Sequence, residues 1–241
     1  MSVDSKLPIL HFAIPIHNEE SQLNEKLDEF LKYYQTLLGK IINQDSKVIM
    51  AENGSTDNTF NLLLEYSKDF DFVKILHDDY AGKGKAIKLA WQNSTADLLG
   101  FSDLDFAVPS KFIPIFIAQM KENDLLIASR NLPDSNVSRS IYRGFLSKIN
   151  VFLTQNILNI PFSDFNCGFK FIKNAAWKSL ELDVVDTGFF FDTEILFYAK
   201  KANLIIREIP VEWREGEYST VNTFKTSYQF IINLIKLKRS A

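Results

Sequence analysis

Two aspartates, Asp103 and Asp105, follow a short apolar stretch at a spacing that could hold a cation. The stretch, Leu98 to Phe101, is typical of a buried strand, and carboxylates two positions apart at a strand end point to the same side. Proteins usually bind Mg²⁺ through one or two carboxylates, and phosphate oxygens complete its shell. The pair therefore indicates a site for Mg²⁺ or Mn²⁺ with a phosphate ester, whereas an isolated D-x-D is more often a polar loop after a strand.

Polar loops also follow three earlier apolar stretches, and each loop leads into apolar residues at helical spacing. The stretches and their loops are Leu10 to Ile16 with His17 to Glu20, Val48 to Ala51 with Glu52 to Asp57, and Phe72 to Leu76 with Gly82 to Lys85. The carboxyl ends of parallel strands meet at one edge of a sheet, which is where such sheets bind ligands. We therefore predict that these loops share a crevice with the two aspartates.

Four strand-loop-helix units in the first 120 residues predict an α/β fold with a mostly parallel, Rossmann-like sheet and helices on both faces. A further strand, Asp124 to Ser129, is expected to bring Arg130 to the same edge. The second half predicts a helix over Ser138 to Leu158, a strand at Phe169 to Phe171, a helix opening at Phe189 to Glu194 and a strand over Ile205 to Val211. No linker-like stretch interrupts this order, so we expect a single domain.

Composition narrows the class of protein. The net charge of −3 argues against a general nucleic-acid binder, which needs a basic face. The single cysteine, Cys167, excludes an intramolecular disulfide and favours a reducing compartment. No stretch has the roughly 20 apolar residues of a membrane-spanning helix. We therefore expect a cytoplasmic protein.

The glycine loop Gly82-Lys83-Gly84 has two interpretations. It lacks the G-x-G-x-x-G pattern of dinucleotide-binding proteins, and the chain has no P-loop motif. It is either a plain turn before a helix or a basic loop that places Lys83 near a substrate phosphate.

Acidic residues among aromatic ones form another candidate group. Asp164, Asp192 and Glu194 lie in phenylalanine-rich stretches, where burial is costly unless the carboxylate is paired or used. Each is a candidate for a base, for an orienting group or for a purely structural role.

The last helical pattern is amphipathic and basic. Phe224, Tyr228, Ile231, Ile232 and Ile235 recur at helical spacing, and lysines lie nearby. Such a helix can pack on its own domain or lie on an anionic membrane surface.

In their order along the chain, these motifs resemble those of the family 2 glycosyltransferases of GT-A fold. Within that family they are similar to the dolichyl- and polyprenyl-phosphate glucosyl- and mannosyltransferases. The motifs are Ile14 to Glu20, Glu52 to Asp57, Gly82 to Gly84, Asp103 to Asp105, Ser129-Arg130 and Cys167 to Lys170. The resemblance implies a GT-A domain over residues 1–222, with a nucleotide-binding half at about 7–130 and an acceptor half at about 131–222. The amphipathic helix is expected over residues 223–241.

The resemblance also implies roles for single residues. Asp103 and Asp105 match the metal-binding pair, with Asp105 the more direct ligand. The remaining matches are Pro15, His17 and Glu19 beside the base and ribose, Glu52 on the base, Arg130 and Arg143 on the acceptor phosphate, and Asp192 near the sugar. Lys83 joins the nucleotide-sugar contacts as a basic loop residue.

The implied activity is metal-dependent, inverting transfer of a hexose from UDP- or GDP-hexose to a polyprenyl or dolichyl phosphate. This would take place in the cytoplasm or on the cytoplasmic face of a membrane, with peripheral contact through the last helix. Two alternatives remain open. One is a related transferase that acts on the hydroxyl of a glycan, protein or small molecule, and the other is a non-catalytic nucleotide-sugar-binding protein.

Overall fold

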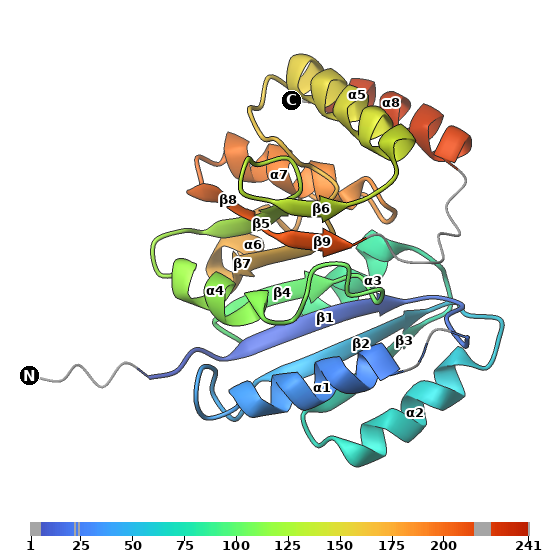
Figure 1. Cartoon of the computed structure of the whole chain (residues 1–241), viewed down its shortest axis with the longest axis vertical. Helices are drawn as coiled ribbons and strands as arrows, with labels where there is room; N and C mark the ends of the chain where they lie inside the picture. Colours follow the sequence, from blue (N-terminus) through green and yellow to red (C-terminus); the bar gives the residue numbers. More distant parts are fainter. Residues whose placement is uncertain (1–5, 22, 24, 215–222, 241) are drawn as a thin grey trace, which may run out of the picture.

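Strands and helices alternate along the first half of the chain, as the sequence predicts (Figure 1). A computed structural model describes residues 6–21, 23, 25–214 and 223–240. The elements of the first half are β1 (Leu10–Ile16), α1 (Glu25–Leu37), β2 (Lys47–Asn53), α2 (Thr59–Asp69), β3 (Val73–Asp78), α3 (Lys83–Trp91), β4 (Leu98–Ser102) and α4 (Phe112–Gln119). Those of the second half are β5 (Leu125–Ser129), β6 (Asn136–Ser138), α5 (Ile141–Leu158), β7 (Phe169–Lys173), α6 (Asn174–Leu180), α7 (Phe191–Lys201), β8 (Ile206–Pro210), β9 (Glu212–Arg214) and α8 (Thr223–Ser240).

A seven-stranded sheet in the order β3-β2-β1-β4-β7-β5-β8 forms the middle layer. Six strands run parallel, and β7 is antiparallel to both of its neighbours, β4 and β5. The predicted α/β class with a mostly parallel sheet is therefore confirmed. The short strands β6 and β9 pair separately.

Each face of the sheet carries its own apolar core, because successive residues of a strand point to opposite faces. Phe12 of β1 packs on one face with Phe30 of α1 and Phe116 of α4, whereas Ala13 belongs to the other face, with Trp91 of α3 and Phe191 of α7. Strands covered on both faces show as nearly continuous apolar runs, which is why β1 could be bounded from its sequence.

The predicted long helix begins three residues later than expected, at Ile141 and not at Ser138. Asn136–Ser138 pairs in parallel with Glu212–Arg214, and this local ladder holds the preceding residues extended. Helix α4 was not predicted. Its sequence is almost entirely apolar and contains Pro114, so it lacks the alternation of polar and apolar faces that indicates a helix.

The last helix, α8, packs on its own domain. It lies beside α5 (Figure 1), and its Leu234 and Leu237 are buried in the core. Phe230 meets Phe190 edge-on at a centroid distance of 5.3 Å. Among the described residues, no helix is long and apolar enough to cross a membrane. The expected domain boundary at residue 222 lies outside the described residues.

Candidate active site

The predicted site residues of the first half gather at the carboxyl edge of the sheet. In the β1–β2 ladder, Pro15 pairs with Ala51 and Ile16 pairs with Glu52. The next strand outward, β3, aligns His77 with Glu52. The loops that follow these strands therefore share one edge with Asp103 and Asp105, which come after β4.

Asp103 belongs to a chain of alternating carboxylates and ammonium groups. The Lys83 Nζ lies 2.7 Å from Asp103 Oδ1 and 2.8 Å from Asp192 Oδ2. The second oxygen of Asp192 accepts a hydrogen bond from the Nζ of Lys170. Both ammonium groups also lie over the ring of Phe101, at 5.4 and 5.6 Å from its centroid. The sheet and α7 thus meet at a buried, charged contact.

The opposite charges of these side chains stabilise each other's ionised forms. Burial alone would raise the pKa of Asp192, but Lys170 and Lys83 outweigh it and lower that pKa. Burial would likewise lower the pKa of Lys83, but Asp103 and Asp192 raise it. A buried carboxylate that pairs with two lysines is a weak proton acceptor, so the geometry favours an orienting role for Asp192 over that of a base.

The start of α3 explains why Lys83 turns inward. The backbone N–H groups of Gly84 and Lys85 donate to the carbonyls of Gly188 and Thr187, at 3.1 and 3.0 Å. A Cβ on Gly84 would come within 2.7 Å of the Phe191 Cβ, so this close approach requires glycine. The loop before α7 therefore occupies amides that could otherwise have held a phosphate, and Lys83 contacts carboxylates.

Asp105 and Glu19 add further negative charge to the site. Burial and then Asp103 raise the pKa of Asp105. Burial, Asp105 and Asp57 raise the pKa of Glu19. The Glu19 Oε2 is buried without a hydrogen-bond partner in the described part of the chain. These groups would all be stabilised by a nearby cation.

The residues present suit a divalent cation that shares its shell with a substrate. Asp103 and Asp105 line a small cavity of about 60 Å³ together with Asn166 and Trp213. Their carboxylate oxygens are the hard donors that Mg²⁺ and Mn²⁺ accept. Within residues 6–21, 23, 25–214 and 223–240, no cluster of three acidic, histidine or cysteine side chains could enclose a metal. The site therefore fits a cation that takes its remaining ligands from phosphate and water.

Gly168 supports the Asp103 carboxylate, and sequence reasoning gave it no role of its own. The Asp103 N–H donates to the Gly168 carbonyl at 3.0 Å. A Cβ built on Gly168 would stand 1.8 Å from Asp103 Oδ2, well inside van der Waals contact. The two residues are far apart in sequence and meet only because β7 inserts beside β4.

Glu52, the expected base-reading acid, is fully buried and held by two partners. Its Oε1 accepts the Ser55 N–H at 2.7 Å, and its Oε2 contacts His77 Nδ1. His17 is exposed and reaches the Asn53 carbonyl through Nδ1 at 2.7 Å. The histidine partner of Glu52 was not predicted, because it comes from the end of a separate strand.

We expect the His77–Glu52 contact to make stability depend on pH. The hydrogen bond to Glu52 raises the pKa of His77 above its ordinary value of 6.5. The stabilisation is therefore complete below that value and is lost as pH rises through the folded-state pKa. His77→Gln should lower the melting temperature most at about pH 6 and progressively less at higher pH. His11→Gln is the control of opposite sign, because burial lowers the pKa of His11. A pH-independent effect of His77→Gln would contradict the assignment.

Arg130 lies between two cavities. Its Nε and Nη2 bind both oxygens of Asp164, at 2.7 and 2.9 Å, and its guanidinium lies 5.4 Å from the centroid of the Trp213 ring. Burial would raise the pKa of Asp164, but the Arg130 charge lowers it. Arg130 lines the small cavity of Asp103 and Asp105, and it also lines a larger one of about 380 Å³.

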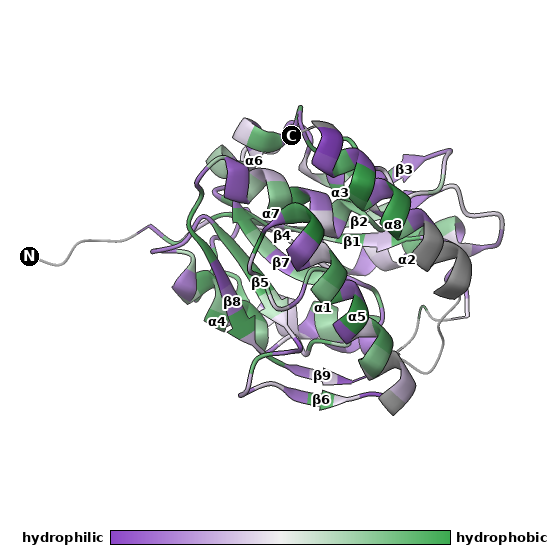
Figure 2. Ribbon diagram, turned by 90° about the horizontal axis from the view of Figure 1, so that it is seen from above, coloured by the Kyte–Doolittle hydropathy of each residue, from purple (hydrophilic) through white to green (hydrophobic). Residues whose placement is uncertain are grey.

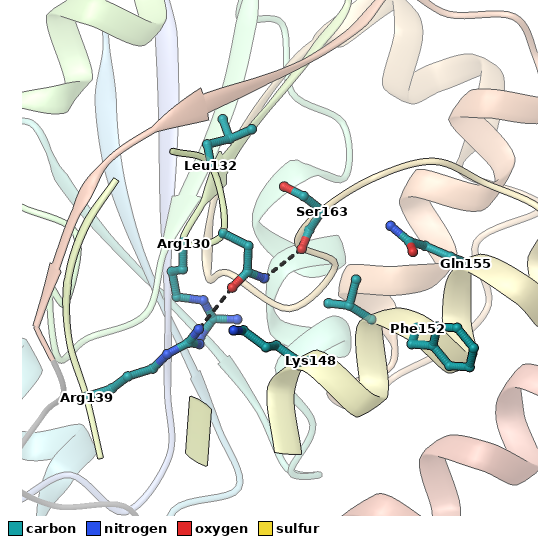
Figure 3. A pocket seen from close by; sticks show the side chains of 9 residues that line it. Arg130, Leu132, Arg139, Lys148, Phe152, Gln155 and Ser163 are labelled. Atoms are coloured by element: carbon teal, nitrogen blue, oxygen red, sulfur yellow. Dashed lines mark hydrogen bonds between the residues drawn. The ribbon is translucent and has the colours of Figure 1, made fainter. Parts of the chain in front are cut away.

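The larger cavity is basic at one end and apolar at the other. In Figure 3 the charged ends of Arg130, Arg139 and Lys148 point toward one another, and Phe152 lies on α5 at the other end of the cavity. Arg139 also donates to the Asn131 Oδ1 at 2.9 Å. Arg143, the second expected acceptor contact, lies in the first turn of α5, but its side chain is outside the described part of the structure. Arg139 and Lys148 were not predicted.

Comparison with known proteins places the chain in a family. The sequence model described as "Glycosyl transferase family 2" matches residues 12–180, which is most of the chain. The chain belongs to glycosyltransferase family 2. The match ends in α6 and includes every expected site residue from Pro15 to Arg143, whereas Asp192 lies beyond it.

Relatives within the family include enzymes named for dolichyl phosphate. Glycosyltransferase AglD of Haloferax volcanii is 31% identical over 216 residues, which cover 88% of this chain and 33% of that protein. Dolichyl-phosphate beta-glucosyltransferase ALG5D of Trichomonas vaginalis is 28% identical, covering 86% and 66%. The dolichyl-phosphate beta-glucosyltransferase of Dictyostelium discoideum is 26% identical, covering 98% and 77%. The chain thus spans a third of the first relative and about two thirds of the second.

Solved structures of a glucosyl-3-phosphoglycerate synthase share the fold of this chain. Glucosyl-3-phosphoglycerate synthase from Mycobacterium tuberculosis, in complex with Mn²⁺, UDP and glucosyl-3-phosphoglycerate, superposes with a TM-score of 0.71 at 15% identity. The match covers 95% of this chain and 80% of that one. At this identity the likeness establishes the fold alone, and it confirms the expected GT-A architecture.

Proposed function

We propose that the chain transfers a hexose from a nucleotide sugar to a polyprenyl or dolichyl phosphate, with inversion at the sugar. The observation that carries this proposal is the position of Arg130, which lines both the carboxylate cavity and the basic, partly apolar cavity. A donor diphosphate at the first cavity and an acceptor phosphate at the second would both lie near one guanidinium. The names of the dolichyl-phosphate relatives support the same acceptor.

A phosphate acceptor also agrees with the engagement of Asp192, the carboxylate considered as a base, by two lysines. A phosphate monoester is already an anion at neutral pH, so its positioning matters more than removal of a proton. Arg130, Arg139 and Lys148 supply charge-assisted hydrogen-bond donors for that purpose. Asp192 is engaged by two lysines and acts in this proposal by orienting Lys83 toward Asp103.

Asp103 and Asp105 would hold Mg²⁺ or Mn²⁺, which, when bound, stabilises the negative charge of the leaving diphosphate. On the protein side, Lys83 and Gly168 fix the Asp103 carboxylate from two directions. In this proposal Pro15, His17, Glu19 and Glu52 would lie nearest the base and ribose of the donor. In this proposal the chain would work at the cytoplasmic face of a membrane and meet its lipid acceptor there.

The direct test is transfer of label from UDP-glucose or GDP-mannose to a polyprenyl phosphate in the presence of Mn²⁺. We expect a lipid-soluble product that disappears when a chelator removes the cation. Transfer of label only to the hydroxyl of a glycan, protein or small molecule would support a related transferase with a hydroxyl acceptor. Binding of nucleotide sugar without transfer or hydrolysis would support the non-catalytic alternative, and either result would overturn the proposed acceptor.

A further inference from the structure

Helix α5 presents a row of large apolar side chains to solvent. Tyr142, Phe145, Ile149 and Phe152 are 60%, 61%, 38% and 65% exposed. Their spacing of three, four and three residues places them on one face of the helix. A contiguous exposed apolar face of this kind marks a surface that meets a membrane or another molecule.

This row is separate from the face by which α5 packs on its own domain. Thr154 and Leu158 of α5 are buried, and Val151 and Ile157 pack against the core. Helix α8 lies beside α5 and buries Leu234 and Leu237 in the same core (Figures 1 and 2). Helix α8 was one expected membrane contact, but its Leu234 and Leu237 serve the fold. Among the side chains that the structure describes, α5 exposes four large apolar residues, whereas α8 exposes Ile231 and Ile235.

The charge of this layer favours an anionic lipid surface as its partner. Helices α5 and α8 together contain six Lys and Arg residues and no Asp or Glu, although the whole chain has 27 basic and 30 acidic residues. Basic segments are attracted to anionic headgroups, and aromatic side chains prefer the interface between lipid and water. An acidic protein with one basic, aromatic layer therefore has a preferred face toward such a membrane.

We propose that the outward face of α5 docks in the interface of an anionic lipid bilayer, with the Arg130–Lys148 cavity opening at headgroup level. Phe152 belongs both to the exposed row and to the lining of that cavity. A lipid phosphate in the membrane could then reach Arg130 while its hydrocarbon chain stays in the bilayer. This link to an acceptor rests on the proposed function, whereas the docking surface does not.

The test is flotation of the 241-residue chain with phosphatidylcholine vesicles that contain or lack phosphatidylglycerol. We expect binding to the anionic vesicles, and at least about tenfold weaker binding by Phe145→Ser/Ile149→Ser, since two apolar side chains no longer leave water. The matched control is Leu182→Ser/Val185→Ser, which removes two exposed apolar side chains distant in sequence from α5. It should bind like the wild type. In vesicles with brominated lipids, Phe145→Trp should lose more tryptophan fluorescence by quenching than the wild type, and Leu182→Trp should not.

The readouts separate this proposal from the proposed activity, because flotation needs neither nucleotide sugar nor acceptor. If no lipid product is ever formed but flotation behaves as expected, the docking surface stands and the proposed function fails. The docking proposal is overturned if the wild type does not float, or if the α5 double variant floats like the wild type. It is also overturned if the double variant changes only self-association, which would make α5 an interface between copies of the chain.

Discussion

Gly168→Ala should abolish most of the proposed transfer activity while leaving the fold intact. The new methyl group would stand 1.8 Å from Asp103 Oδ2, so the carboxylate has to move. Displacement of a reacting or positioning group by about 1 Å can reduce a rate by about 100-fold. We therefore expect a loss of at least that size, measured as kcat/KM with a labelled nucleotide sugar, together with weaker Mn²⁺ binding by titration calorimetry.

The control for this variant is Gly144→Ala in α5. There the nearest atom to a new Cβ is the Nε of the flexible Arg139 side chain, at 3.4 Å. Alanine in a helix interior is more favourable than glycine by roughly 0.5–1 kcal/mol, so this variant should be as stable as the wild type or slightly more so. Normal activity and Mn²⁺ binding in Gly168→Ala would show that neither depends on the contact between Gly168 and Asp103.

Much of the fold could be predicted because the sheet is covered on both faces. The run Leu10–Ile16 is almost entirely apolar, and its strand has the predicted ends. The same rule of strand ends placed Glu52 beside the loops of Pro15 and Asp103 before any contact was known. The beginning of α5 was missed because a two-stranded ladder with Glu212–Arg214, far away in sequence, decides it.

The candidate site was predicted where its residues follow strands, and missed where they act through a distant partner. Lys170 alternates with Phe169 and Phe171 in β7, a pattern that normally puts the lysine in water. It is buried instead, because α7 covers that face and supplies Asp192 as its partner. Lys83 was expected near a phosphate because it lies in a glycine loop. In the structure its Nζ contacts two carboxylates.

The buried contact of Lys170 links the candidate site to the stability of the whole domain. Its Nζ donates to Asp192 and to the carbonyls of Cys167, at 2.7 Å, and Phe165, at 3.3 Å. The carbonyl contacts fix the turn that leads into Gly168, and Asp192 fixes Lys83. One ammonium group therefore orients both supports of the Asp103 carboxylate.

Lys170→Met should consequently destabilise the protein by about 3–5 kcal/mol, the usual cost of removing one partner of a buried ion pair. Urea denaturation followed by circular dichroism measures this change. Lys173→Met is the control on the same strand, because Lys173 is partly exposed and its pair with Asp124, at 3.1 Å, should contribute no more than about 1 kcal/mol.

The double variant Lys170→Met/Asp192→Asn decides whether Asp192 is the partner that matters. With the negative charge also gone, the loss should be smaller than the sum of the two single losses by about 0.5–3 kcal/mol. Strict additivity would mean that Lys170 stabilises the fold through its two carbonyl contacts alone. In that case Asp192 would orient Lys83 without help from Lys170, and the support of Asp103 from α7 would depend on a single ion pair.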